Sequence, residues 1–161
     1  MTDSRNITNP PSDDDPIVGI ANEIAAHHKR IGELDRAEVP LTEVPLDSRQ
    51  DEIQSFYERI FAAQDELTEL RAQSVEGALV QLAAAMSIFL DIADNEVDAE
   101  TRQIAIIRYR RLVYSAIPVL CDALGVDQDD LALPHFLEPW LNPWNAPRDT
   151  GGNVIRFHES H

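Results

Sequence analysis

Apolar residues recur at alternating steps of three and four along one stretch of the chain, and this spacing constrains the fold more than any other feature. The stretch covers residues 53 to 70, where the repeating residues are Ile53, Phe56, Ile60, Ala63, Leu67 and Leu70. Residues three and four apart lie on the same side of an α-helix, so the spacing places one apolar stripe along a helix. A strand would need apolar residues at every second position. The spacing therefore predicts a helix here, and three further segments show it too.

Residues suited to cap helices stand at the ends of these segments. Asp15 precedes Pro16, and proline is well suited to the first position of a helix. Ser74 and Asp98 are placed to cap the third and fourth segments, and Gly125 is placed to end the fourth. These signals predict an all-α bundle of about four helices, over residues 16–36, 49–73, 75–93 and 99–124.

Two positions inside the predicted helices carry specific expectations. Ser48 with Asp51 three residues later imitates a capping box, which starts the second helix near Arg49. Pro118 lacks a backbone N–H, and its ring crowds the carbonyl four residues earlier. We therefore expect a kink in the fourth helix at Pro118, or a division of that helix into two shorter ones.

The third segment is apolar on most of its faces, so we expect it to be the most buried helix. Its predicted core-facing residues are Val75, Leu79, Leu82, Met86, Phe89 and Ala93. The fourth segment carries two apolar stripes on different sides, and one core cannot cover both. The first stripe contains Ile106, Tyr109, Val113, Ala116 and Leu120. The second stripe contains Ile104, Ile107, Tyr114 and Cys121.

The chain has 161 residues, which is the length of one domain. Residues 1–15 are polar and rich in aspartate, and we expect them to form a disordered acidic tail. Residues 16–125 form the predicted helical bundle domain. Residues 126–150 are predicted to form an extended strap, rich in proline and tryptophan, that packs on or near the bundle. Residues 151–161 begin with two glycines and are predicted to be a flexible tail.

The net charge of the chain limits the classes of partner that it is expected to bind. There are 29 acidic and 13 basic residues, which gives a net charge of −16 at pH 7. Such a charge opposes binding to nucleic-acid phosphates and to anionic lipids, so we expect no nucleic acid and no membrane as partner. The arginines between residues 108 and 111 are expected to pair with acidic side chains of the second and third helices.

Three observations predict a cytoplasmic protein. Residues 1–15 contain no apolar run that resembles the core of a signal peptide. The longest apolar stretch, residues 78–93, is interrupted by polar residues and is shorter than the roughly 20 residues that span a bilayer. Cys121 is the only cysteine, which fits a reducing compartment.

Carboxylates on the second and third helices suggest an enzyme as an alternative. Asp65 and Glu66 followed by Glu69, and Asp91 followed by Asp94, are spaced like the EExxE and ExxD motifs of the all-α nucleoside triphosphate pyrophosphatases related to MazG, which this pattern resembles. The resemblance implies hydrolysis of nucleotides with Mg²⁺ held by Glu66, Glu69, Asp91 and Asp94. The chain departs from the family because aspartate stands first in each motif.

The same carboxylates also fit a solvated acidic face, which is the interpretation that we favour. Glu69 lies roughly 140° from the apolar stripe of its helix and is expected to point to solvent. The chain contains no glycine-rich phosphate loop, nucleophile elbow or paired-cysteine site. We therefore predict no catalytic residue, no metal site and no cofactor.

Three large aromatic residues, Phe136, Trp140 and Trp144, stand in the proline-rich segment and need a pocket to cover them. We expect them to pack on the second stripe of the fourth helix, and self-association across that helix is the competing solution. A docking peptide for another protein is a further alternative. The candidate interaction residues are Phe136, Trp140, Trp144, Ile104, Ile107 and Tyr114. The predicted function is that of a non-enzymatic adaptor or regulatory protein.

Overall fold

The computed structural model describes residues 15–36, 46–94 and 96–145. Within these ranges the chain has four α-helices and no β-strand, which confirms the predicted all-α class. The helices are α1 (Pro16–Arg36), α2 (Leu46–Glu69), α3 (Val75–Ala93) and α4 (Ala99–Leu124). The predicted tails at residues 1–14 and 146–161, and the loop at residues 37–45, lie outside the described residues.

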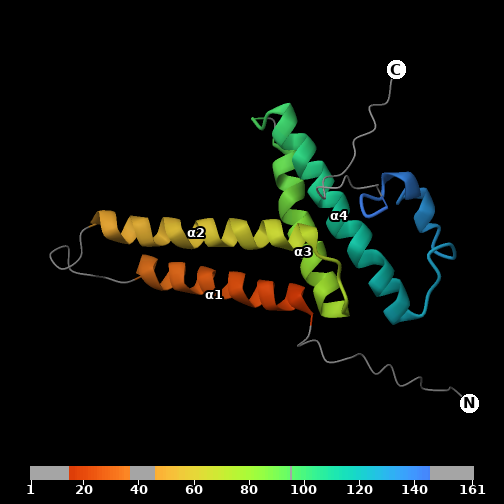
Figure 1. Cartoon of the computed structure of the whole chain (residues 1–161), viewed down its shortest axis with the longest axis horizontal. Coiled ribbons are helices and arrows are strands. Elements are labelled where there is room, and N and C mark those ends of the chain that lie inside the picture. Colours follow the sequence, from red (N-terminus) through yellow and green to blue (C-terminus); the bar gives the residue numbers. More distant parts are fainter. Residues whose placement is uncertain (1–14, 37–45, 95, 146–161) are drawn as a thin grey trace, which may run out of the picture.

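The helices pair as two antiparallel hairpins, α1 with α2 and α3 with α4, and the first hairpin crosses the second at a steep angle (Figure 1). Helices α1 and α2 meet the second hairpin only at one end, and their other end extends away from it (Figure 1). No helix in the described part of the chain is long and apolar enough to cross a membrane.

The predicted caps are confirmed at three helix starts and one helix end. The Asp15 carboxylate accepts a hydrogen bond from Ile17 N at 3.0 Å. Ser74 Oγ accepts from Gly77 N at 2.9 Å, and Asp98 caps α4 in the same way. Gly125 has φ of 65°, the left-handed conformation that glycine adopts without steric cost at the end of a helix.

The bounds of α2 differ from the prediction at both ends. The helix begins at Leu46, so Ser48 lies inside it rather than before its first residue. It ends at Glu69, four residues before the predicted end. The physical reason for the early end is Gln81 of α3, whose side-chain amide donates to Leu67 O and Leu70 O at 3.3 and 2.8 Å. These carbonyls would otherwise accept bonds from residues that continue the helix.

Helix α4 runs unbroken from Ala99 to Leu124 with Pro118 inside it, so the alternative of two shorter helices is wrong.

The core lies where the two hairpins cross and is built largely from small side chains. Its buried residues are Ile17, Ile20, Ala63, Leu67, Ala72, Ala78 and Ala116. Four of them are alanines, which allow helices to approach closely. The apolar and polar side chains of α3 that are fully buried are Ala78, Gln81 and Ala85, while Val80 and Leu82 pack half-buried against the core. The Phe89 ring is half exposed and lies 6.2 Å from the ring of Tyr109 in α4.

The predicted core face of α3 is confirmed at Leu82, which packs against the core, and wrong at its other large residues. Leu79, Met86 and Phe89 were expected in the core, and all three are exposed, as is Leu90. Helix α3 is also not the most buried helix, because it carries more large exposed apolar residues than any other described helix. The alanine face binds the neighbouring helices, which leaves the larger side chains on the outside.

The segment after α4 is turn-rich rather than extended. It contains two short 3₁₀-helices, η2 (Leu133–His135) and η3 (Pro139–Leu141). Pro134 is the second residue of η2 and Pro139 is the first residue of η3, and the fixed φ of proline suits the start of a helical turn. The prolines thus start local turns. Of the strap predicted for residues 126–150, the described part, 126–145, is therefore not extended, and residues 146–150 lie outside the described residues.

Candidate functional site

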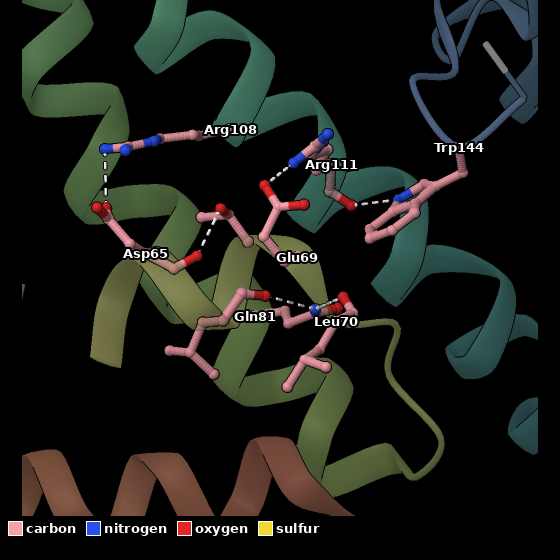
Figure 2. Close-up of polar contacts among 9 residues, drawn as sticks. Asp65, Glu69, Leu70, Gln81, Arg108, Arg111 and Trp144 are labelled. Carbon is pink, nitrogen blue, oxygen red and sulfur yellow. Dashed lines mark hydrogen bonds and ion pairs between the residues drawn. The ribbon is translucent and has the colours of Figure 1, made fainter. Parts of the chain in front are cut away.

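The C-terminal segment, residues 126–145, is held on α4 by two aromatic side chains. The Tyr114 hydroxyl donates to Glu138 O at 2.8 Å. The Trp144 indole N–H donates to Arg111 O at 2.8 Å (Figure 2). Burial raises the pKa of the Tyr114 phenol above its ordinary value, so the hydroxyl stays a donor at neutral pH. Two points of the segment are therefore tied to one helix face.

Trp144 also joins the segment to the loop between α2 and α3. The guanidinium groups of Arg71 and Arg111 lie 4.9 and 5.8 Å from the centre of its rings. These distances are in the range of cation–π attraction. Arg71 Nη2 donates to Trp144 O at 3.4 Å as well. The half-buried Trp144 thus packs on its own chain.

Phe136 and Trp140 are the two aromatics of the C-terminal segment that the described part of the chain leaves exposed. Their exposed fractions are 79% and 76%, against half-burial for Trp144. Both lie between the two anchoring points, Tyr114–Glu138 and Trp144–Arg111, or next to them in sequence. The segment therefore holds Phe136 and Trp140 outward on a fixed base.

The second stripe of α4 is covered at one end only. Cys121 is buried, and Ile107 and Tyr114 are half-buried, with Tyr114 bonded to the C-terminal segment. Ile104, nearest the start of the helix, remains exposed. The segment therefore contacts the part of the stripe around Tyr114.

Arginines of α4 pair with the acidic residues of α2, as the sequence predicted. Arg108 contacts Asp65 at 2.9 Å, and Arg111 forms an ion pair with Glu69 (Figure 2). Arg111 is largely buried, whereas the Glu69 side chain is half exposed. The expectation that Glu69 points only to solvent is wrong, because α4 crosses the end of α2 and brings Arg111 to it.

Of the four carboxylates of the alternative metal site, the three whose side chains the structure describes do not form a metal-binding group. Glu69 is paired with Arg111, and Glu66 is exposed. Asp94 accepts a bond from Glu96 N at 2.9 Å in a local turn. The Asp91 side chain lies outside the described residues. Within the described part of the chain, no three His, Cys, Asp or Glu side chains are placed to hold a metal ion.

A hollow of about 300 Å³ lies beside the Arg108–Asp65 pair, between α2 and α3. Three of its polar lining residues are bonded to one another, because Thr68 Oγ donates to Asp65 O at 2.8 Å and Arg108 binds the Asp65 carboxylate. Its other lining residues are Phe61, Gln64, Ala84, Ser87 and Ile88. This lining does not pair a nucleophile with a base.

The outer face of α3, which we define as Leu79, Met86, Phe89 and Leu90, is a surface that sequence reasoning missed. These residues were assigned to the core or left unassigned, and all four are exposed. The signal that could have found it is the apolar character of α3 on most sides, since one helix pair cannot cover every face.

Comparisons with protein-family models, with curated proteins and with solved structures find no match to this chain. Its function is therefore argued from its own residues.

Proposed function

We propose that this protein is a non-enzymatic adaptor or regulatory protein that binds a protein partner through Phe136 and Trp140. The observation that carries the proposal is the exposure of these two large aromatics, 79% and 76%, on a segment that is itself tied down. Large aromatic residues supply most of the binding energy in many protein interfaces. Exposed apolar surface of this kind marks sites of interaction with other proteins.

The anchoring of the segment supports the same conclusion. Tyr114 and Trp144 bond the backbone of Glu138 and Arg111, so the turns that carry Phe136 and Trp140 are held before a partner arrives. A preorganised surface pays less conformational entropy when it binds. Free peptides with the same aromatics would pay that cost on binding.

The charge of the chain supports a protein as the partner. A net charge of −16 opposes nucleic acids and anionic membranes. Cys121, the only cysteine, is a buried free thiol, which supports a cytoplasmic location. We therefore place the proposed interaction with a protein of the cytoplasm.

The test compares three forms of the full chain as bait in native lysate, with quantitative mass spectrometry of the captured proteins. The double variant Phe136→Ser/Trp140→Ser removes the aromatics. The control Leu124→Ser removes an apolar side chain of equal exposure, 76%, at the end of α4. We expect at least one captured protein to fall by about tenfold with the double variant and to stay unchanged with the control.

Circular dichroism of all three forms is measured to check that each variant keeps the helical content of the wild type. A set of captured proteins that does not change when both aromatics are replaced would contradict the proposal. Light scattering tests whether the two aromatics instead join two copies of this chain. In that case the wild type is a dimer and the double variant is a monomer, which would also contradict the proposal.

A further inference from the structure

The outer face of α3 forms one continuous apolar stripe. Leu79, Met86 and Leu90 are separated by seven and four residues, which places them on one side of the helix. Their exposed fractions are 56%, 63% and 68%. Ala83, also exposed, fills the position between Leu79 and Met86, and Phe89 borders the stripe. The stripe extends over about 17 Å of helix.

No described segment of the chain covers this stripe. Tyr114 and Arg111 of α4 bind the C-terminal segment, and Figure 1 shows α4 between that segment and α3. Helix α2 crosses α3 at the hollow around Ala84 and Ile88, which lie on other sides of the helix. A stripe of this length on a helix has the size and shape at which amphipathic helices bind through residues at steps of three, four and seven.

The charges around the stripe determine which helix fits it. Residues 74–98 carry five acidic residues and no basic one. The nearest arginines along the chain are bound elsewhere. On the N-terminal side, Arg71 lies over the Trp144 rings and donates to Trp144 O. On the C-terminal side, Arg102 donates to Asp94 O and Val97 O, and Arg108 pairs with Asp65. An apolar stripe in acidic surroundings is complementary to an apolar stripe with basic flanks. A second copy of this chain would bring two acidic surfaces together instead.

We infer that the outer face of α3 binds an amphipathic helix of another protein, in which lysines and arginines flank the apolar stripe. The apolar side chains of that helix cover Leu79, Met86 and Leu90, and its basic side chains meet the acidic residues at the ends of α3. This surface shares no residue with Phe136 and Trp140, so it goes beyond the proposed function. An adaptor with both surfaces joins two partners.

The experiment measures binding of a fluorescent helical peptide to the full chain by anisotropy. The probe is a peptide of about 18 residues with a leucine stripe and lysines on its other positions. A matched peptide keeps the leucine stripe and has glutamate in place of each lysine. We expect the lysine peptide to bind at least about tenfold more tightly than the glutamate peptide, and to bind less tightly as salt is raised.

Variants of the protein locate the binding surface. Met86→Gln/Leu90→Gln is expected to weaken the lysine peptide by about tenfold or more. The control Leu124→Gln, on an equally exposed residue of α4, is expected to change affinity less than about twofold, as is Phe136→Ser/Trp140→Ser. Phe136→Ser/Trp140→Ser removes the surface of the proposed function and leaves the outer face of α3 intact. A failure of one proposal can therefore be distinguished from a failure of the other.

Three results would overturn the inference. The first is equal binding of the lysine and glutamate peptides. The second is binding of the lysine peptide that is unchanged by Met86→Gln/Leu90→Gln, in a protein whose circular dichroism is also unchanged. The third is a wild-type dimer that the same double variant converts to a monomer, which assigns the face to a second copy of the chain.

Discussion

Two regions of this protein use polar and apolar residues in opposite ways. At the junction of the two hairpins, around residues 67–77, polar side chains are buried, whereas on the outer face of α3 large apolar side chains are exposed. The junction binds backbone groups that would otherwise lack partners. The outer face leaves apolar area in water. The difference indicates that the junction determines the fold, and that the outer face is free to serve binding.

At the junction, side chains from the start of α1, from α3 and from α4 form hydrogen bonds with backbone groups of the loop between α2 and α3. Asp15 accepts from Gln73 N at 3.1 Å and from Ser74 Oγ at 2.7 Å. Gln81 donates to the carbonyls of Leu67, in the last turn of α2, and of Leu70, directly after it. Ser115 Oγ accepts from Ala72 N at 2.7 Å. Buried backbone groups are costly when they are unpaired, so these bonds select one arrangement of the helices.

The largest expected effect is at Asp15, which is buried and bonds across the junction. Asp15→Ala removes the cap of α1 and leaves Gln73 N and Ser74 Oγ without their partner. We expect a loss of about 3 kcal/mol in the free energy of unfolding, measured by urea denaturation. The matched control is Asp98→Ala, which removes an exposed cap with only local bonds. Equal losses for the two variants would show that the junction adds nothing to the fold.

Gly77 tests how tightly the junction is packed. A Cβ at this position would overlap the Asp15 carboxylate. Gly77→Ala should therefore destabilise by about 2 kcal/mol, although alanine favours helix over glycine. At Gly19 of α1 a Cβ meets no atom within 4 Å, so Gly19→Ala should stabilise by about 0.5–1 kcal/mol.

A double-mutant cycle assigns the Gly77 effect to its contact with Asp15. In an Asp15→Ala background the obstacle is absent, so Gly77→Ala should cost nothing further. Additive losses in the cycle would mean that the carboxylate is not what restricts this position.

The exposed cap of α4, Asp98, contributes a stability that depends on pH, and it can be compared with the buried cap Asp15. The pKa of Asp98 lies below its ordinary value of 3.8, because the backbone N–H and then the hydroxyl of Thr101 donate to the carboxylate. The stability from this cap is therefore fully present above the ordinary pKa and is lost as pH falls through the lowered pKa. Asp98→Asn keeps an acceptor that does not titrate, so the wild-type Tm should fall more steeply than that of the variant as the pH is lowered below the ordinary pKa of 3.8. Parallel Tm curves would contradict this.

The smallest effect is expected on the outer face of α3. Met86→Gln should change the free energy of unfolding by less than about 0.5 kcal/mol, because the side chain is already in water. Its neighbour Ala85 is buried, and Ala85→Gln should cost about 2 kcal/mol through overpacking. If Met86→Gln were the more damaging of the two, α3 would pack through the face that the sequence pattern predicted.

Most of the helix bounds could be predicted from the sequence, because a cap acts through neighbours along the chain. Ser74, Asp98 and Gly125 each bond backbone groups within a few residues, and α1, α3 and α4 have the predicted bounds. The end of α2 could not be predicted, because its last carbonyls are bound by Gln81, which lies a loop and a helix turn further on.

The candidate site divides in the same way. The composition of the C-terminal segment drew attention to Phe136, Trp140 and Trp144, yet nothing in the sequence separates them. In the tertiary structure Arg71 and Arg111 lie against Trp144, which therefore packs on its own chain. Phe136 and Trp140 stay exposed. The pairing of the α4 arginines with α2 was predicted from charge, but its particular partners depend on where the helices cross.

The sequence by itself determined that the described part of this chain is helical and where most of its helices start and stop, because the period of apolar residues and the caps are local properties. The tertiary structure alone decided which side of α3 is buried. Apolar residues occur all round that helix, so burial depends on how closely a neighbour can approach. The alanine face, Ala78 and Ala85 with Gln81 between them, allows the closest approach and binds the carbonyls of α2. Leu79, Met86 and Leu90 remain outside for this reason.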